Sequence, residues 1–344
     1  MTQRRFLIIR PDRIGDVVLT TPLIRAVKKS FPGSFVAVMV GSYTAPLLEH
    51  NPHIDLLLTD DPEGKDSARS GFWHQVVKLR QLRFDTGLMP LPRERHAWMM
   101  LLAGVNKRIG VGTKLYQVLT GMKTVSRHKY IPLRHEADYV MDLGRRIGIT
   151  TDDLKPEIFV PEEEKIIARQ FFTQNGFDIS KPIIGINPGS NSSSPNWPPE
   201  KYSHVVKQLS RTHQVFVNVG PKSSNLEKHF NSINSNIVIH APDNLRDLIG
   251  LCSLLSVLVA PSTGTMHIAA ALGIPTVSLF CPLTACSPKL WGPIGNSSEI
   301  ILPPEGYCQG RCPGNPKICP FEEITVDEVV LKTISLVKNK MMGT

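Results

Sequence analysis

The sequence predicts an α/β protein made of two doubly wound domains, each built on a parallel sheet. Short runs rich in β-branched residues alternate with helical patterns over nearly the whole length, which is typical of βα units. The chain has 344 residues, more than a single hydrophobic core usually supports. Helical periodicity restarts after an acidic, proline-containing stretch at residues 152–164. We therefore expect domains over residues 1–155 and 156–325, and a last helix at 326–344 that packs back on the first domain.

The first domain is expected to alternate strands and helices from its beginning. Four apolar runs have the length and β-branched content of buried parallel strands, at residues 6–9, 34–40, 56–59 and 86–89. Helical patterns occupy residues 15–29, 72–82, 97–102 and 136–147. Pro22 removes an amide donor inside the first of these patterns, so it is expected to kink that helix or to begin its next segment.

The second domain is expected to repeat this alternation. Its predicted strands are residues 183–187, 215–219, 237–239, 257–260 and 276–280, and its last helix is predicted at 326–338. Two such domains facing each other would line a cleft with the carboxyl ends of both sets of strands, where ligands of these sheets bind. Each of the three motifs described below follows a predicted strand.

Composition and charge narrow the classes of protein and partner. Apolar residues make up 41% of the chain and charged residues 20%, which suffices for two folded cores. The formal net charge of +9 suits anionic partners such as phosphorylated substrates or acidic lipid headgroups. The basic residues are scattered, without interleaved aromatic residues or a finger motif, which argues against nucleic acid. Neither a secretory signal nor an apolar run of about 18 residues occurs, so we expect a cytoplasmic location.

The first motif, FLIIRPDRIGDVVLTTP, places Gly15 and Asp16 where a strand turns into a helix. A carboxylate near a helix N-terminus is held ionised by the helix dipole, and it would lie where an acceptor hydroxyl approaches. Asp16 is therefore the candidate catalytic residue. Capping of the helix is the alternative interpretation, and it is the commoner use of Asp at such a position.

The second motif, GINPGSNSSSPNWPPEKY, is a loop rich in Gly and Ser between a strand and a helix. It lacks both the Gly-Lys-Ser/Thr of a Walker loop and the GxGxxG fingerprint. Its hydroxyls and amides could still surround phosphate oxygens, and an ordinary polar surface loop is the alternative. Trp197 is expected to anchor the loop in the core. The candidate donor-binding residues of this loop are Ser190, Ser192, Ser193 and Ser194.

The third motif, LVAPSTGTMHIAAALGIP, predicts a strand, a turn and a helix of small residues. Hydroxyls and the first amides of the helix would bind a diphosphate, and Gly264 would let the backbone approach it. His267 could add a proton donor or a positive charge, although a single His on such a helix is more often structural. The candidate donor-binding residues of this segment are Ser262, Thr263, Gly264, Thr265, Met266 and His267.

Three basic residues are candidates for binding an acidic acceptor. Arg93, Arg95 and His96 follow the fourth predicted strand, at the end where ligands bind. Their side chains could contact phosphates or acidic sugars. An exposed, solvated loop explains the same residues equally simply.

The cysteines near the C-terminus form another cluster. Cys308, Cys312 and Cys319 share one loop, and Cys281 and Cys286 precede it in the sequence. Their uneven spacing does not match the paired knuckles of a zinc site, and a cytosolic location argues against stable disulfides. We therefore expect packed thiols and no metal site.

Taken together, Gly15-Asp16, the loop PGSNSSSPNWP and the segment APSTGTMHIAAALGIPTVSLFCP resemble the heptosyltransferase group, glycosyltransferase family 9, over most of the chain. The resemblance implies the GT-B fold, in which two Rossmann-like domains face each other. It also implies inverting transfer of a heptose from ADP-heptose to the lipopolysaccharide inner core, without a metal or another cofactor. By position, Asp16 would be the general base, and Thr263, Gly264, Thr265 and His267 would hold the departing diphosphate.

The same resemblance supplies expected partners. The first domain would bind a lipid-linked acidic glycan acceptor, with peripheral contact to the inner face of the inner membrane, and the second a nucleotide-diphosphate sugar donor. Three positions differ from the family pattern: Pro195 and Asn196 replace a Lys, Ser262 replaces an Asp, and a family Glu falls near Ser223. Two alternatives follow, a GT-B-type nucleotide-sugar epimerase and a catalytically inactive nucleotide-sugar-binding protein.

Overall fold

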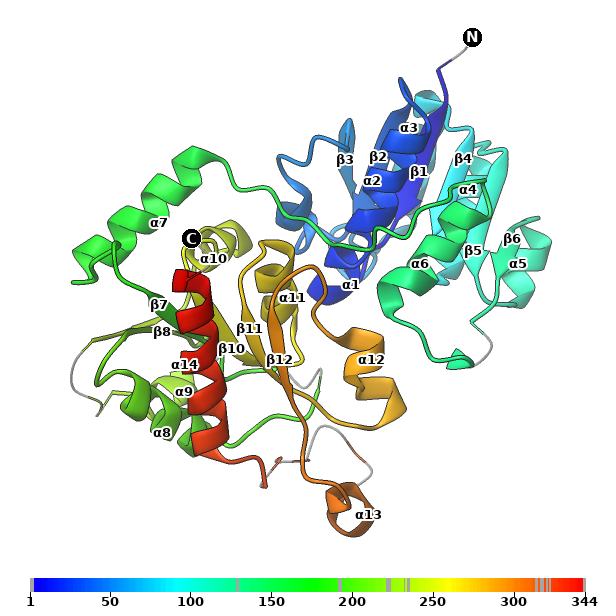
Figure 1. Cartoon of the computed structure of the whole chain (residues 1–344). Helices are drawn as coiled ribbons and strands as arrows, with labels where there is room; N and C mark the ends of the chain where they lie inside the picture. The colour runs from blue at the N-terminus through cyan, green and yellow to red at the C-terminus, as the bar shows by residue number, and fades with distance from the viewer. Residues whose placement is uncertain are drawn as a thin grey trace. The chain divides into compact units, whose positions relative to one another are not determined.

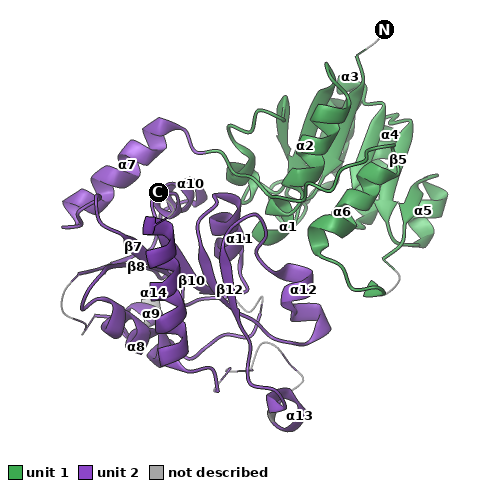
Figure 2. Ribbon diagram, viewed as in Figure 1, with its two compact units in different colours: residues 1–159 green, residues 160–344 purple. Residues whose placement is uncertain are grey.

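The structure, a computed structural model, divides the chain into two compact units (Figure 2). They comprise residues 1–159 and 160–344. The boundary between them falls inside the acidic stretch at 152–164. The residues that the structure describes are 3–127, 130–190, 194–220, 224–231, 233, 236–312, 315, 319, 321 and 323–342.

The first unit is built on a parallel sheet of six strands in the order β3-β2-β1-β4-β5-β6 (Figure 1). The strands are β1 Arg5–Ile9, β2 Phe35–Val40, β3 Leu56–Thr59, β4 Thr86–Met89, β5 Lys107–Val111 and β6 Lys123–Val125. The helices are α1 Ile14–Val18, α2 Thr21–Ser30, the short 3-10 helix η1 Ala45–Leu48, α3 Arg69–Leu82, α4 Glu94–Leu102, α5 Leu115–Leu119 and α6 Glu136–Arg145.

The second unit has a parallel sheet of six strands in the order β12-β11-β10-β7-β8-β9. The strands are β7 Ile183–Ile186, β8 Gln214–Asn218, β9 Ile237–His240, β10 Val257–Pro261, β11 Thr276–Leu279 and β12 Ser298–Ile301. The helices are α7 Glu162–Gln174, α8 Pro199–Leu209, α9 Ser224–Glu227, α10 Leu245–Cys252, α11 Gly264–Ala271, the 3-10 helix η3 Thr284–Cys286, α12 Pro288–Trp291, α13 Tyr307–Arg311 and α14 Val326–Met342.

Both sheets have the same strand order when each is counted from its own first strand. That order is 3-2-1-4-5-6, which is typical of dinucleotide-binding folds. In the first unit, β2 and β3 lie on one side of β1, and β4 to β6 lie on the other. In the second unit, β8 and β9 lie on one side of β7, and β10 to β12 lie on the other. Ligands of such sheets bind outside the carboxyl ends of the strands where the two groups meet, at the switch point. The topology therefore indicates two places to search for function, one in each unit.

The central strands are continuous apolar runs because both faces of each sheet are covered. In β1, Leu7, Ile8 and Ile9 are completely buried, as expected for a parallel strand with helices on both sides. The helix predicted at residues 15–29 is interrupted and becomes α1 and α2. Pro22 lies in the first turn of α2, where its missing amide costs nothing, so the predicted second segment is confirmed.

The last helix, α14, red in Figure 1, packs against α8, β10 and β11 of its own unit. The expectation that it also packs on the first domain stays a prediction. The buried face of α14 enters the core of the second unit through Val329, Leu336 and Val337. Lys340 also donates a hydrogen bond to the Leu255 carbonyl at 3.0 Å. No helix in the described part of the chain is both long and apolar enough to cross a bilayer.

Candidate active site

The three sequence motifs lie at the carboxyl ends of the central strands. The Gly15-Asp16 turn follows β1, the serine-rich loop follows β7, and the Ser262–His267 segment follows β10. The first motif therefore borders the switch point of the first sheet. The other two border the switch point of the second sheet from both sides. Each motif is where a ligand of a doubly wound sheet is expected.

Asp16 lies in the first turn of α1, but it does not cap that helix. The N-cap residue is Arg13, and no side chain makes a capping hydrogen bond there. The Asp16 carboxylate instead accepts a hydrogen bond from Nη2 of Arg10. Its side chain keeps 17% of its surface exposed, so an acceptor can reach it. The geometry therefore does not support the capping alternative.

Arg10 is the centre of a buried charge network. Its Nε lies 2.9 Å from Oδ1 of Asp12, and its Nη2 lies 3.3 Å from Oε1 of Glu136 in addition to the bond with Asp16. Glu136, at the start of α6, is fully buried and accepts two further hydrogen bonds from Arg127, both at 2.9 Å. Three carboxylates thus share two guanidinium groups at the carboxyl end of β1.

The network shifts the pKa values of two of its members, Asp12 and Arg10. Burial raises the pKa of Asp12 from 3.8 to about 7, against the opposing attraction of Arg10. Burial also disfavours the charged form of Arg10, but the three carboxylates outweigh it and raise the Arg10 pKa. Arg10 therefore stays cationic, and it lies in direct contact with the Asp16 carboxylate. Nη1 of Arg10 is buried without a hydrogen-bond partner among the described residues.

The structure explains Arg95 and His96 by an internal contact. Both bind the fully buried carboxylate of Asp60, which follows β3: Arg95 through two hydrogen bonds of 3.0 and 2.9 Å, and His96 through Nε2 at 2.9 Å. The His96 ring is itself 1% exposed. The alternative of an exposed loop is wrong for His96. Arg93 is exposed at the N-cap of α4, and among the three candidates it remains the one open to solvent.

Side chains of the serine-rich loop donate hydrogen bonds to backbone carbonyls of the same loop. Ser190 is buried, and its hydroxyl donates to the Ser194 carbonyl at 3.0 Å, while the Ser194 hydroxyl donates to the Pro195 carbonyl at 3.2 Å. Asn196 takes part as well, through a bond of 2.8 Å from its amide to the Pro188 carbonyl. The other two candidates, Ser192 and Ser193, lie outside the described residues.

Trp197 fixes this loop to the core, as the sequence predicted. Its side chain is 1% exposed. It packs edge-to-face on Tyr202 of α8, with ring centroids 5.3 Å apart. At the start of the loop, Asn187 is also fixed, because Asn218 at the end of β8 donates to its side-chain oxygen at 2.7 Å. The described parts of the loop, on both sides of residues 191–193, are therefore fixed to the end of β7.

The third motif forms a capped helix start beside β10. Thr263 is the N-cap of α11, and its hydroxyl accepts a hydrogen bond from the Thr265 amide at 3.1 Å. The remaining first-turn amides of a helix point out of its N-terminus and attract anions. Ser262 is half-buried, whereas Met266 and His267 are buried in the helix face that packs on the sheet. The small alanines of α11 are also buried, consistent with close packing.

The cysteines are packed thiols, as expected. All six are free. Cys281 and Cys319 are buried in the core of the second unit, and Cys286 and Cys308 pack against that core. Within the described ranges, no group of three or more His, Cys, Asp or Glu side chains is arranged to hold a metal ion.

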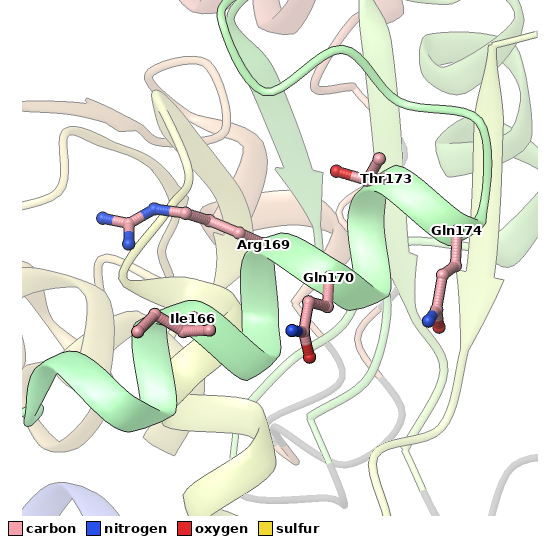
Figure 3. A pocket seen from close by; sticks show the side chains of 5 residues that line it. All are labelled: Ile166, Arg169, Gln170, Thr173 and Gln174. Atoms are coloured by element: carbon pink, nitrogen blue, oxygen red, sulfur yellow. The ribbon is translucent and has the colours of Figure 1, made fainter.

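A surface hollow lies away from these motifs. It is lined by residues from one helix, α7, which Figure 3 shows along that helix: Ile166, Arg169, Gln170, Thr173 and Gln174. Arg169 is engaged there by an ion pair with Glu162 of the same helix. The hollow contains no residue of the three motifs, and we do not assign it a role in the site.

Four residues of the Arg10 network are absent from the sequence predictions. Arg10 and Asp12 had a visible signal, because two charged residues follow a completely apolar strand and precede the Gly15-Asp16 turn. Glu136 and Arg127 had none. Glu136 lies 126 residues from Arg10 along the chain, and no local pattern connects them.

Comparisons with known proteins place the chain beside sugar-transferring enzymes. The family model described as glycosyltransferase family 9 (heptosyltransferase) matches residues 73–313. Lipopolysaccharide heptosyltransferase 2 of Escherichia coli is 25% identical over 321 residues, covering 89% of this chain and 90% of that protein. The structure of a family 9 glycosyl transferase from Veillonella parvula has a TM-score of 0.85 and 21% identity, covering 98% and 97% of the two chains. The structure of E. coli heptosyltransferase WaaC with ADP has a TM-score of 0.73 and 15% identity, covering 96% and 99%.

Proposed function

Since the chain belongs to glycosyltransferase family 9, the heptosyltransferase family, we propose that it transfers a heptose from ADP-heptose, with inversion, to the inner core of lipopolysaccharide or a related cell-surface glycan. The expected GT-B fold class is confirmed by the two parallel sheets and by the solved structures that the chain resembles. The family match does not favour the two alternatives, an epimerase and an inactive nucleotide-sugar-binding protein.

One observation carries the proposed roles: a partly exposed carboxylate, Asp16, lies at the switch point of the first sheet and is bound by the buried cation Arg10. A general base must be ionised and accessible to the proton that it takes. The second sheet brings the helix start at Thr263 and the loop at Ser190 to either side of its own switch point. This arrangement supports acceptor binding in the first unit and donor binding in the second.

In the proposed reaction, the Asp16 carboxylate accepts the proton of the acceptor hydroxyl while that oxygen forms a bond to the anomeric carbon of the heptose. The bond from this carbon to the ADP oxygen breaks on the opposite face, so the anomeric configuration inverts. The electron pair of the broken bond leaves with ADP, and the first amides of α11 bind the negative charge of its diphosphate. Arg10 holds Asp16 in position for the proton transfer.

We further propose that donor binding needs no metal ion, because helix amides and hydroxyls near Ser262 and Thr265 can neutralise the diphosphate. ADP as the nucleotide is supported by the WaaC structure, which contains ADP. Pro195 and Asn196 stand where family members carry a Lys. Neutral hydrogen bonds from the serine-rich loop are the proposed substitute.

The acceptor is proposed to be a lipid-linked acidic glycan, reached by peripheral contact with the inner face of the inner membrane. The formal net charge of +9 supports this proposal, since anionic lipids and core phosphates both attract a basic protein. Arg93, which is exposed, is the described candidate for contact with acceptor phosphates. Arg95 contributes less, because Asp60 already engages its guanidinium.

The role of Asp16 is tested by Asp16→Ala. Loss of a general base typically costs ~10²-fold or more in rate, whereas affinity for ADP is expected to stay unchanged. The transfer rate is measured by ADP release in the presence of a core-oligosaccharide acceptor. The affinity for ADP is measured by calorimetry. Asp152→Ala, an exposed carboxylate of the same unit, is the matched control. Turnover equal to that of the wild type in Asp16→Ala would remove the residue from the mechanism.

The donor assignment is tested by thermal unfolding with ADP, UDP, GDP and CMP, each with and without EDTA. We expect ADP alone among these nucleotides to raise Tm. At an ADP concentration 100 times its Kd, the free energy of unfolding should rise by about 3 kcal/mol. EDTA should not change this shift. His267→Ala should reduce the shift if the imidazole contributes to the diphosphate site. A Tm increase with UDP alone would show that the donor nucleotide is UDP. Loss of the ADP-induced Tm increase when EDTA is present would contradict metal-independent binding.

A further inference from the structure

The short helix α5 carries three aliphatic residues on the side that faces solvent. Leu115, Val118 and Leu119 are 74%, 74% and 62% exposed. They occupy positions i, i+3 and i+4, so they lie on one side of the helix. Single exposed aliphatic residues are ordinary, but three on one helical face form a continuous apolar surface. We call these three residues the α5 face.

A buried polar residue fixes this inverted orientation. Gln117 is completely buried. Its amide donates to the Val111 carbonyl at 2.9 Å, and its side-chain oxygen accepts from the Lys114 amide at 2.8 Å. Tyr116 packs against the core of the first unit from the same side. Because these contacts hold the inner side of α5, the α5 face is presented to solvent as part of the native fold.

Basic residues flank α5 along the chain. Lys114 immediately precedes the helix, Lys123 begins the strand that follows it, and Lys107 begins the strand before it. All three are exposed, and none forms an ion pair within the ranges that the structure describes. No Asp or Glu occurs in the sequence between Glu94 and Glu136, whereas eight Lys and Arg residues do. Glu94 itself is on α4, the helix that packs against α5.

We propose that the α5 face is a docking surface for an anionic lipid bilayer, into which Leu115, Val118 and Leu119 insert while the flanking lysines bind headgroup phosphates. An apolar helix face bordered by Lys and Arg is the arrangement that binds at the boundary between acyl chains and acidic headgroups. A second copy of the chain is a poorer occupant. Stable interfaces use roughly 20–30 residues a side, and a symmetric contact would bring the same lysines together.

The position of α5 in the sheet agrees with this role, which rests on the proposed function. The helix begins just after the carboxyl end of β5, two strands from β1 in the sheet order. With about 4.8 Å between neighbouring strands, its first turn lies on the order of 10 Å along the sheet from the strand that Asp16 follows. Docking through the α5 face would hold this edge of the first unit near the headgroups, where a lipid-linked glycan presents its sugars.

The test is co-sedimentation of the full-length protein with phosphatidylcholine vesicles that do or do not contain phosphatidylglycerol. The wild type should bind the anionic vesicles, less at high salt, and bind the neutral ones weakly. The triple variant Leu115→Ser, Val118→Ser and Leu119→Ser should lose at least about tenfold in affinity. Lys114→Gln with Lys123→Gln should lose the preference for phosphatidylglycerol. The matched control is Ile167→Ser with Leu331→Ser, two exposed aliphatic residues of the second unit.

Each outcome decides the proposal. Equal vesicle binding by the triple variant and the wild type, or no binding by the wild type, overturns it. A wild-type dimer that becomes monomeric in the triple variant by light scattering also overturns it, because a second copy would then cover the α5 face. Transfer to a soluble, delipidated acceptor should be the same in the triple variant and the wild type. If neither the wild type nor the triple variant transfers the sugar, the result counts against the proposed function alone, because vesicle binding is measured in a separate experiment.

Discussion

Among single residues, the buried guanidinium of Arg10 has the greatest influence on the proposed chemistry. It contacts Asp12, Asp16 and Glu136 while only 3% of its side chain is exposed. Arg127 neutralises part of Glu136, so the network contains one carboxylate more than its two guanidinium groups. Asp12 is the carboxylate whose charged form is disfavoured, because burial raises its pKa to about 7. Asp16 is bound to the same cation, and its side chain is 17% exposed, against 13% for Asp12.

The raised pKa of Asp12 predicts how stability depends on pH. Asp12 binds its proton more tightly in the folded chain than its ordinary pKa of 3.8 allows, so wild-type stability should fall as pH rises from about 4 to 7. Asp12→Asn keeps an acceptor for Arg10 but removes the ionisation. It should therefore stabilise the protein more at about pH 8 than at about pH 5, by on the order of a few kcal/mol.

Urea unfolding of the wild type and Asp12→Asn at both pH values measures this effect. Asp152→Asn, an exposed carboxylate, is the control and should follow the wild type. If Asp12→Asn keeps the pH dependence of the wild type, the raised pKa belongs to another group.

At the scale of helices and strands, the sequence predicted the strands that form apolar runs and missed β5, β6 and β12. The predicted strands at 56–59 and 86–89 match β3 and β4. β4 is buried along its whole length, whereas β3, at an edge of the sheet, is mostly half-buried. The missed strands include β6 and β12, which end their sheets. Strands at an edge have one neighbour and tolerate polar residues, so Lys123–Val125 and Ser298–Ile301 gave no apolar signal.

β5 was missed for a different reason. It begins with Lys107 and Arg108 and contains Gly110, which weakens a strand pattern. The structure shows close packing there: a Cβ at Gly110 would lie 2.5 Å from the Met122 sulfur, so a larger residue would require that side chain to move. The candidate site shows the same division between local and tertiary signals. Residues next to strand ends were found, whereas contacts such as Arg10 with Glu136 depend on tertiary packing that local patterns do not encode.

The contact of α4 with the end of β3 predicts a loss of stability on mutation. Burial alone would raise the pKa of Asp60, but hydrogen bonds from His96 and Arg95 hold it below its ordinary value. Asp60→Ala removes the acceptor that both side chains share, and breaking a buried ion pair in this way typically costs about 3–5 kcal/mol. Because the pKa is lowered, this stabilisation is present above about pH 4 and is lost as pH falls further.

Chemical denaturation of Asp60→Ala at neutral and acidic pH measures the loss. The exposed carboxylate of Glu63, changed to Ala, provides the control. We expect the gap between Asp60→Ala and the wild type to narrow in acid. A gap that is small at neutral pH would show that Arg95 and His96 find other partners.

For the whole molecule, the two units each have their own parallel sheet and their own hydrophobic core. We therefore predict that residues 1–159 and 160–344 fold when expressed separately. Each fragment should unfold cooperatively in urea, with an m-value of about 1–3 kcal/mol/M, as is typical of a small domain. A fragment ending before α14, at residue 325, is the matched comparison and should lose cooperativity. Non-cooperative unfolding of the fragment 160–344 would contradict the independence of the units.

The placement of α14 also bears on how the protein is made. The last helix of the chain completes the second unit, so the first unit requires no segment that is synthesised later. At about 5–20 residues per second, a ribosome takes on the order of ten to forty seconds to make the rest of the chain, and the first unit can close its core during that time. The second unit must wait for its final residues. Truncation before α14 should therefore leave an intact first unit joined to an incomplete second unit, which exposes the surface that α14 normally covers.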